Sequence, residues 1–470
     1  MRSRYGRPAV PPFEESVQSS GRALLRDRRV ATFLIAATAQ TVATTLQAAA
    51  LGQQVFKITD STLALGFLGL FEFLPALILL PLTGSAADRF DRRRVAAIAM
   101  AAEVVTSLLY FAYAATRPTS VIPIFAIALL FGTARAFAAP SFRALPPLVA
   151  PEDGLPRLIA FYSGTWQFGL IVGPALSGFL YAIDPTVPYV VAAMAFGVAT
   201  LMATTLTVRR LQVRTPASER PSFAHAMEGL RFIRRRQVLL GAITLDMFAV
   251  LFGGAVALLP AIAEDRLGVG SIGYGWLRAA PGIGAVLVTV LLAIRPVRQR
   301  VGTTLLVAVA VFGVATVVLG ITHTYAVAFV ALLILAGADA VSVFIRATIV
   351  PLATPDEMRG RVMAVENVFI GASNELGAFE SGVAGALLGV GPAVWLGGLL
   401  TIGVVGVTSA VFPDLRDIDR FEDLEGGLPI PPHEPLLDIG DSWPAETSDL
   451  GGTVLAPDGE VQPRSGGGPT

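Results

Sequence analysis

Apolar stretches of about 20 residues recur along most of the chain, and each is long enough to cross roughly 30 Å of hydrocarbon as a helix. A soluble core uses helices with one polar face, so it does not produce such stretches repeatedly. Only 15% of the 470 residues are charged, whereas soluble domains carry roughly 25%. The sequence therefore predicts an all-α polytopic membrane protein in a lipid bilayer.

We place twelve membrane-spanning segments and use the basic residues to orient them. Arginines gather before the first segment and in every second connection, while the alternate connections hold only Lys57, Arg117 and Arg266. Because basic loops stay in the cytoplasm, this alternation predicts a multi-pass cell-membrane protein with both termini cytoplasmic. The segments are 30–51, 64–83, 95–115, 120–139, 158–183, 187–208, 238–261, 273–294, 303–321, 325–345, 362–388 and 393–412.

Breaks in the apolar pattern divide the chain into two groups of six segments with polar parts around them. The central break carries an arginine-rich amphipathic stretch, expected to lie on the anionic cytoplasmic leaflet. The C-terminal part is rich in Gly, Pro, Asp and Glu, too few of its residues are apolar to offset the entropy of ordering, and we expect disorder there. The parts are a cytoplasmic segment 1–29, a six-helix bundle 30–208, a cytoplasmic linker 209–237, a six-helix bundle 238–412 and a disordered cytoplasmic tail 413–470.

The two groups of segments resemble each other in sequence. FRALPPLVAPED at 142–153 matches IRATIVPLATPDE at 345–357, and the matched Arg143 and Arg346 are 203 residues apart, since 346 − 143 = 203. A duplicated unit of six spans explains the match. Two such halves around a shared central cavity are typical of transporters that work by alternating access.

The loop after the second segment carries a motif of five fixed positions. It reads GSAADRFDRRR from Gly84 to Arg94 and resembles the G-x-x-x-D-R-x-x-R-R loop of the major facilitator superfamily. The resemblance implies the major facilitator fold, with twelve transmembrane helices in two pseudo-symmetric six-helix bundles. It also implies a conformational latch formed by Gly84, Asp88, Arg89, Arg92 and Arg93.

The fifth segment contains Gly169, Gly173, Pro174 and Gly178. It resembles the G-x-x-x-G-P-x-x-G-G motif of proton-coupled drug exporters, with Ser177 in place of one glycine. Three stretches, the DRFDRRR loop, ARAFAAPSFRALPPLV and the seventh segment LDMFAVLFGGAVALLP, resemble the subgroup that contains enterobactin exporters and macrolide or tetracycline efflux pumps. The resemblance implies export, but close helix packing explains the same small residues.

Ionisable residues inside the apolar segments are rare enough to be functional candidates. Asp246 lies near the middle of the seventh segment and is the first candidate for protonation or cargo contact, although a hydrogen-bonded structural role fits equally well. Glu72 and Arg278 occupy positions related by the repeat, since 278 − 72 = 206. Glu366 lies near the cytoplasmic end of the eleventh segment, where a gate or proton entry is expected. Glu103 is interpreted as a helix-to-helix hydrogen-bonding residue.

Arg135 and Asp339 also occupy positions related by the repeat, since 339 − 135 = 204. We hypothesise that they pair across the two halves when the cytoplasmic side closes, and separate when it opens. The alternative is that each charge is satisfied within its own half. Two further glutamates of the eleventh segment, Glu375 and Glu380, rank below Glu366 because they cannot all face one small site.

Composition excludes several classes of function. The chain has no cysteine and a formal net charge of zero, which argues against thiolate chemistry and against nucleic-acid binding. Its single lysine, Lys57, lies in no phosphate-binding loop, and its three histidines form no metal cluster. We therefore expect no cofactor, no metal and no enzyme activity. The leading interpretation is a monomeric proton-coupled exporter of amphiphilic small molecules; proton-coupled uptake, or a non-transporting sensor or scaffold, remains the alternative.

Overall fold

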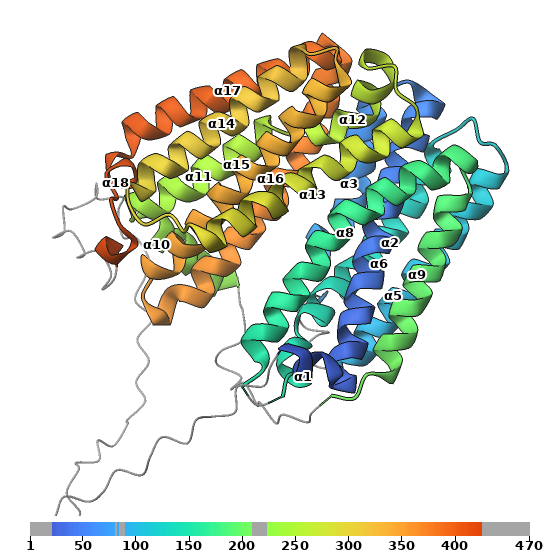
Figure 1. Ribbon diagram of the computed structural model, residues 1–470, viewed down its shortest axis with the longest axis horizontal. Helices are drawn as coiled ribbons and strands as arrows, with labels where there is room; N and C mark the ends of the chain where they lie inside the picture. The colour runs from blue at the N-terminus through green and yellow to red at the C-terminus, as the bar shows by residue number, and fades with distance from the viewer. Residues whose placement is uncertain (1–20, 80–81, 84–89, 152, 209–222, 425–470) are drawn as a thin grey trace, which may run out of the picture. The chain divides into compact units, whose positions relative to one another are not determined.

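The computed structural model describes residues 21–79, 82–83, 90–151, 153–208 and 223–424. All of them lie in one unit of the chain, Met1–Leu428. Every regular element among these residues is a helix (Figure 1). The all-α fold expected from the apolar segments is therefore confirmed.

Each of the twelve predicted segments coincides with one long helix or, for the seventh, with a helix and its short continuation. The first half has α2 (Arg28–Thr59), α3 (Thr62–Ile78), α5 (Arg92–Ala115), α6 (Ile122–Arg143), α8 (Leu155–Ile183) and α9 (Val187–Thr205). The second half has α11 (Gln237–Phe252), α13 (Ser271–Ile294), α14 (Val301–Ile321), α15 (Tyr325–Leu352), α16 (Asp356–Leu388) and α17 (Val390–Val411).

Short elements connect or flank these helices. The α-helical ones are α1 (Gly21–Arg26), α7 (Pro146–Val149), α10 (Phe223–Arg234), α12 (Leu259–Ala261) and α18 (Pro413–Arg416). The others are a 3₁₀ turn at Ala255–Leu258, a π-helical turn at Ile262–Arg266 and a 3₁₀ turn at Phe421–Leu424.

Ten helices of the described chain are long and apolar enough to cross a membrane, counting α11 with its continuation to Arg266 as one. The two predicted spans outside this group differ for separate reasons. Helix α3 is apolar but has 17 residues. Helix α16 has 33 residues but carries Glu366, Glu375 and Glu380, which lower its hydropathy. Charged groups of this kind are tolerated in a span when they face the protein interior.

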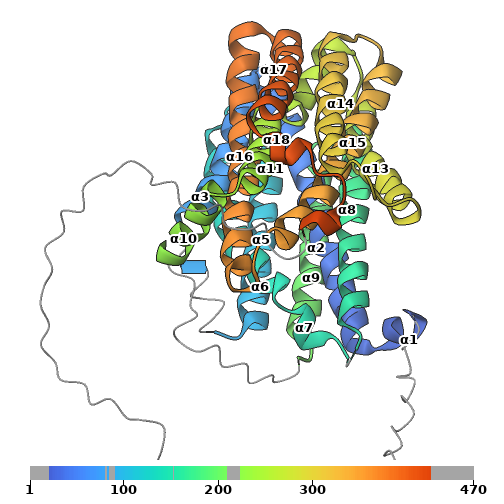
Figure 2. The ribbon, with the colours of Figure 1, turned by 90° about the vertical axis from the view of Figure 1, so that its left-hand side faces the viewer.

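The long helices alternate in direction, so their ends form two sides. We call the side where α2 begins and α3 ends the arginine side, because it carries the basic connections. The side where α2 ends and α3 begins is called the opposite side. Helix α10, which lies in the predicted linker, packs beside the arginine-side end of α16 (Figure 2). There Ile233 is buried with Val362 and Val365, and Arg361 pairs with Glu228 at 2.6 Å.

The first part of the tail that the sequence predicts to be disordered, residues 413–424, is ordered. Leu415, Ile418 and Leu424 are buried in one cluster with Val301 at the start of α14. The backbone N–H of Val301 also donates to the carbonyl of Asp419 at 3.2 Å. The expectation of disorder is therefore wrong for residues 413–424, because spaced apolar side chains cover the end of α14. The remainder of the predicted tail lies outside the described residues.

Two helix pairs join the halves, α3 with α16 and α8 with α13. A Cβ atom on Gly178 would lie 2.9 Å from the Cα of Gly275, and one on Gly382 would lie 2.8 Å from the Cα of Gly66. Such backbone-to-backbone approaches require glycine. Gly178 and Gly382 are 204 residues apart (382 − 178 = 204), which matches the repeat seen in the sequence. Both crossings lie toward the opposite side.

The crossing at Gly178 generates a first prediction. We expect Gly178→Ala to lower stability by about 1 to 3 kcal/mol, because the new methyl group meets the backbone of α13, which cannot rotate away. Gly164→Ala on the same helix is the matched control, since nothing lies within 4 Å of its Cβ position. Helix propensity alone should make that variant slightly more stable. Thermal unfolding of the purified proteins measures both, and equal midpoints would contradict the predicted crossing.

Candidate functional site

A buried cluster of three charged side chains joins α11, α15 and α16 in the second half. Arg346 Nη2 lies 2.7 Å from Asp246 Oδ1, and Arg346 Nη1 lies 3.6 Å from Glu366 Oε1. The side chains of Arg346 and Asp246 are 5% and 6% exposed. One guanidinium thus holds two carboxylates, where an unpaired charge would be strongly destabilising. The structure brings Asp246 and Glu366, both predicted as site residues, to one site.

Asp339 lies beside this cluster without joining it by a hydrogen bond or ion pair within the described residues. It shares a cavity of about 10 Å³ with Asp246 and Ser342. The hydroxyl of Ser342 is buried and has no hydrogen-bond partner. Most of the remaining lining is apolar, so Asp339 and Ser342 are isolated polar groups next to the ion pair.

The first half has its own polar clusters. Arg135 Nη1 on α6 lies 3.8 Å from Glu72 Oε2 on α3. Gln40 Nε2 on α2 donates to Glu103 Oε2 on α5 at 2.6 Å, and Glu103 is fully buried. The interpretation of Glu103 as a helix-to-helix hydrogen-bonding residue is confirmed. Arg135 remains 43% exposed, which for a charge inside a span is typical of a water-filled cavity.

The structure does not join Arg135 to Asp339. Arg135 pairs within its own half with Glu72, as the alternative interpretation expects. The hypothesised pair between the halves therefore stays a prediction for a conformation with a closed arginine side. Arg278, the repeat-related counterpart of Glu72, donates to the carbonyl of Val256 at 2.8 Å.

Glu375, which the sequence ranked below Glu366, lies against the first half of the protein. Its carboxylate reaches across to the first half, where a Cβ atom on Gly69 of α3 would lie 3.5 Å from Glu375 Oε2. The charges of Arg135, Arg278 and Glu375 all interact with that of Glu72. No signal in the sequence identified this contact, because it depends on the angle at which α3 crosses α16.

The predicted latch is described only in part, since Gly84, Asp88 and Arg89 lie outside the described residues. Asp91, which the sequence did not single out, caps α5 by accepting from the N–H of Arg93 at 2.9 Å. Arg93 Nη1 donates to the carbonyl of Leu206 at the end of α9 at 2.7 Å. Arg92 is the first residue of α5. Carbonyls at a helix C-terminus attract cations, so Arg93 ties two helices of the same half.

The glycines of the fifth predicted segment lie on two faces of α8. Gly169 and Gly173 face α2, where Cβ atoms would overlap Thr41 and Thr45. The hydroxyl of Thr45 donates to the carbonyl of Gly169 at 2.8 Å. Pro174 lies inside the helix and is buried, and Gly178 contacts the other half. The motif therefore places α8 against both halves at once.

Comparison with known proteins places these features in context. A family model described as the Major Facilitator Superfamily matches residues 30–378. "Macrolide efflux protein A" of Streptococcus pyogenes is 26% identical over 217 residues, which is 44% of this chain and 52% of that protein. The chain therefore spans about half the length of that relative. "Multidrug efflux pump Tap" of Mycobacterium tuberculosis (strain ATCC 25618 / H37Rv) is 27% identical over 361 residues, covering 74% of this chain and 84% of that protein.

Solved structures share the fold at low sequence identity. A D-xylose-proton symporter matches with a TM-score of 0.63 and 15% identity, covering 82% of this chain and 98% of its own. An inward-facing, unoccupied bacterial homologue of the human lysosomal transporter Spinster matches with a TM-score of 0.61 and 14% identity, covering 83% and 96%. These likenesses confirm the expected arrangement of helices.

The buried cluster generates a second prediction. We expect Arg346→Gln to lower stability by about 3 to 5 kcal/mol, because two carboxylates lose their shared partner. Adding Asp246→Asn should recover part of the loss, since the cost of an unpaired charge falls; a double-mutant cycle of unfolding midpoints measures this coupling. The control is Arg416→Gln, which breaks an exposed pair with Asp417 and should leave the midpoint unchanged. Strictly additive effects of the two buried substitutions would contradict the cluster.

Proposed function

Because the chain belongs to the Major Facilitator Superfamily, we propose that it exports amphiphilic small molecules across the cell membrane by alternating access, in exchange for protons. The observation that carries the proposal is the buried Asp246–Arg346–Glu366 cluster in a chain whose relatives include a multidrug efflux pump matched over most of its length. Those relatives are transporters and not enzymes. Drugs or siderophores are the proposed cargo.

Proton coupling is supported by the way Arg346 shares its charge. A proton on Asp246 removes the negative charge at 2.7 Å and leaves Glu366 as the remaining partner of the guanidinium. The proton acts as a ligand that favours one arrangement of α11, α15 and α16. Its binding therefore shifts the population of molecules toward that arrangement. Asp339 and Ser342 provide polar groups next to the proton's position. Glu72 is a second candidate, in the first half.

Alternating access is supported by where the halves touch. The glycine crossings lie toward the opposite side, whereas Arg135 is 43% exposed nearer the arginine side. We propose that the arginine side is cytoplasmic, with both termini there, because basic connections stay inside. In this conformation cargo would enter from the cytoplasm. The chain is proposed to work as a monomer. The alternative function, uptake, would use the same charged clusters with the cargo moving inward.

The role of Asp246 generates a third prediction. In energised cells we expect wild-type efflux of ethidium to stop when a protonophore is added. We expect Asp246→Asn to reduce efflux about a hundredfold or more, which is the range of a lost acid–base group. The matched control is Asp414→Asn, an exposed aspartate at the start of α18, which should export normally. Protonophore-sensitive efflux that survives Asp246→Asn would move the proton site to Glu72 or Glu366. Accumulation of ethidium would instead favour uptake.

Opposite movements of the two sides generate a fourth prediction. The chain has no cysteine, so spin labels can be attached at chosen cysteines without background. We expect labels at positions 94 and 357, which are exposed at the arginine-side ends of α5 and α16, to show two distances, the shorter from molecules in which the arginine side is closed. The distance between labels at 60 and 323, on the opposite side, should increase as the population with a closed arginine side grows. Electron-spin distance measurements with and without a proton gradient test this, and a single unchanging distance at both pairs would contradict alternating access.

A further inference from the structure

A cavity of about 850 Å³ lies on the opposite side and contains none of the residues predicted from the sequence. Its volume is within the range of sites for drug-sized molecules, about 300 to 1,000 Å³. The first half contributes the turn between α2 and α3, and the second half contributes the π-helical turn, the end of α14 and the turn between α16 and α17. A ligand in this cavity would therefore touch both halves at once.

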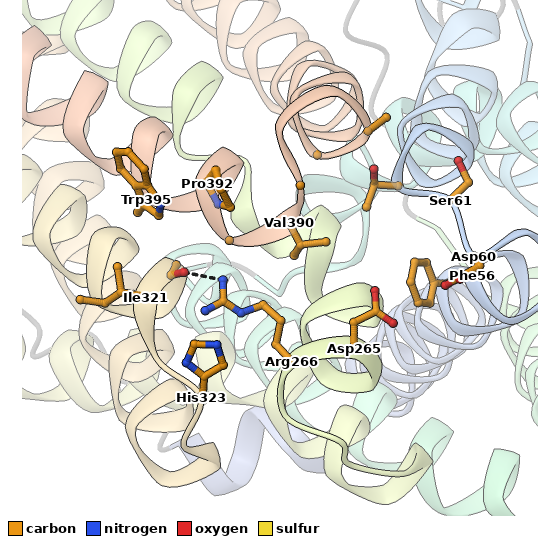
Figure 3. A pocket seen from close by; sticks show the side chains of 16 residues that line it. Phe56, Asp60, Ser61, Asp265, Arg266, Ile321, His323, Val390, Pro392 and Trp395 are labelled. Atoms are coloured by element: carbon orange, nitrogen blue, oxygen red, sulfur yellow. Dashed lines mark hydrogen bonds between the residues drawn. The ribbon is translucent and has the colours of Figure 1, made fainter.

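Charge is distributed unevenly around the cavity (Figure 3). Asp60 and Asp265 lie on one side, near enough for their charges to interact, and neither makes an ion pair among the described residues. The guanidinium of Arg266 turns away from them and donates to the carbonyls of Gly320 at 2.5 Å and Thr322 at 3.1 Å. The two carboxylates thus form a negative region on one side of a cavity whose lining also includes Arg266, a guanidinium that is bound to carbonyls and not to a carboxylate.

Across the cavity from the two carboxylates, apolar and aromatic side chains lie on the same side as His323 and the guanidinium of Arg266 (Figure 3). Trp395 and Pro392 from α17 form part of the lining, together with Val390. Aromatic faces attract cations and also offer a large apolar surface. The combination of a carboxylate pair with an aromatic wall is the chemistry that recognises an organic cation with an apolar body.

We propose that this cavity binds an organic cation arriving from the opposite side, with its charged nitrogen between Asp60 and Asp265 and its apolar body against Trp395. Asp60 belongs to the first half and Asp265 to the second, so a bound cation relieves the repulsion between them. The cation therefore stabilises the conformation in which the opposite side is closed, and it stops the transport cycle. The binding does not depend on the proposed export, but the inhibition does.

Binding is tested with hexamethonium, whose two fixed charges keep it from crossing the bilayer. Added outside cells, it cannot reach a site that is open only to the arginine side. The protein is purified in nanodiscs as a variant with Trp395 as its only tryptophan. We expect a saturable change in Trp395 fluorescence, with affinity about tenfold or more weaker for Asp265→Asn, a change of one strong contact. Asp414→Asn is the matched control, because Asp414 is an exposed aspartate of α18 on the arginine side, outside the cavity lining, and it should bind normally.

A second variant separates the cavity from a general effect of charge. Ala386 lines the cavity and is exposed, so Ala386→Phe fills space without changing charge and should also abolish binding. In energised cells, external hexamethonium should inhibit ethidium efflux by the wild type and by Asp414→Asn, but not by Asp265→Asn. Equal binding to all variants, or no fluorescence change in the wild type, would overturn the site. Normal binding without inhibition would retain the site and overturn its proposed effect on transport.

Discussion

The two glycine crossings between the halves determine where every other feature lies. In a bilayer there is little hydrophobic driving force between helices, so association depends on close packing and on hydrogen bonds. Gly178 against Gly275 and Gly66 against Gly382 let α8 and α3 approach the other half to backbone contact. The hydroxyl of Thr62 adds a bond to the carbonyl of Gly382 at 3.1 Å. These contacts close the opposite side and leave Arg135 accessible toward the arginine side.

The buried charges are arranged so that this junction can open. Arg346 holds Asp246 and Glu366 within the second half, and Arg135 holds Glu72 within the first. A rotation of one half against the other therefore need not separate either pair inside a medium where an unpaired charge is costly. Glu375 is the exception, since its carboxylate lies against α3. It is the charged group best placed to respond when the halves move.

The positions of the helices could be predicted from sequence because lipid imposes a minimum apolar length on each span. Asp246 could be found because a carboxylate in such a span is rare. Arg346 was missed as its partner because the predicted segment ended at residue 345, whereas α15 continues to Leu352 and carries the guanidinium into the interior. The contact of Glu375 with α3 was not predicted because it depends on the angle at which the two helices cross. The ordered structure of residues 413–424 was not predicted because Leu415 packs on a helix that is distant in sequence.

The proposed transport cycle requires that the closure of the opposite side be reversible. Glycine contacts and single hydrogen bonds are individually weak, so the closed opposite side can open if only a few kilocalories per mole separate the states. Asp60 and Asp265 weaken that closure further, because it brings two like charges together across the junction. A closure built only of apolar contacts would lack this opposing term. The repulsion therefore favours reopening, and any cation that neutralises it shifts the balance toward the closed state.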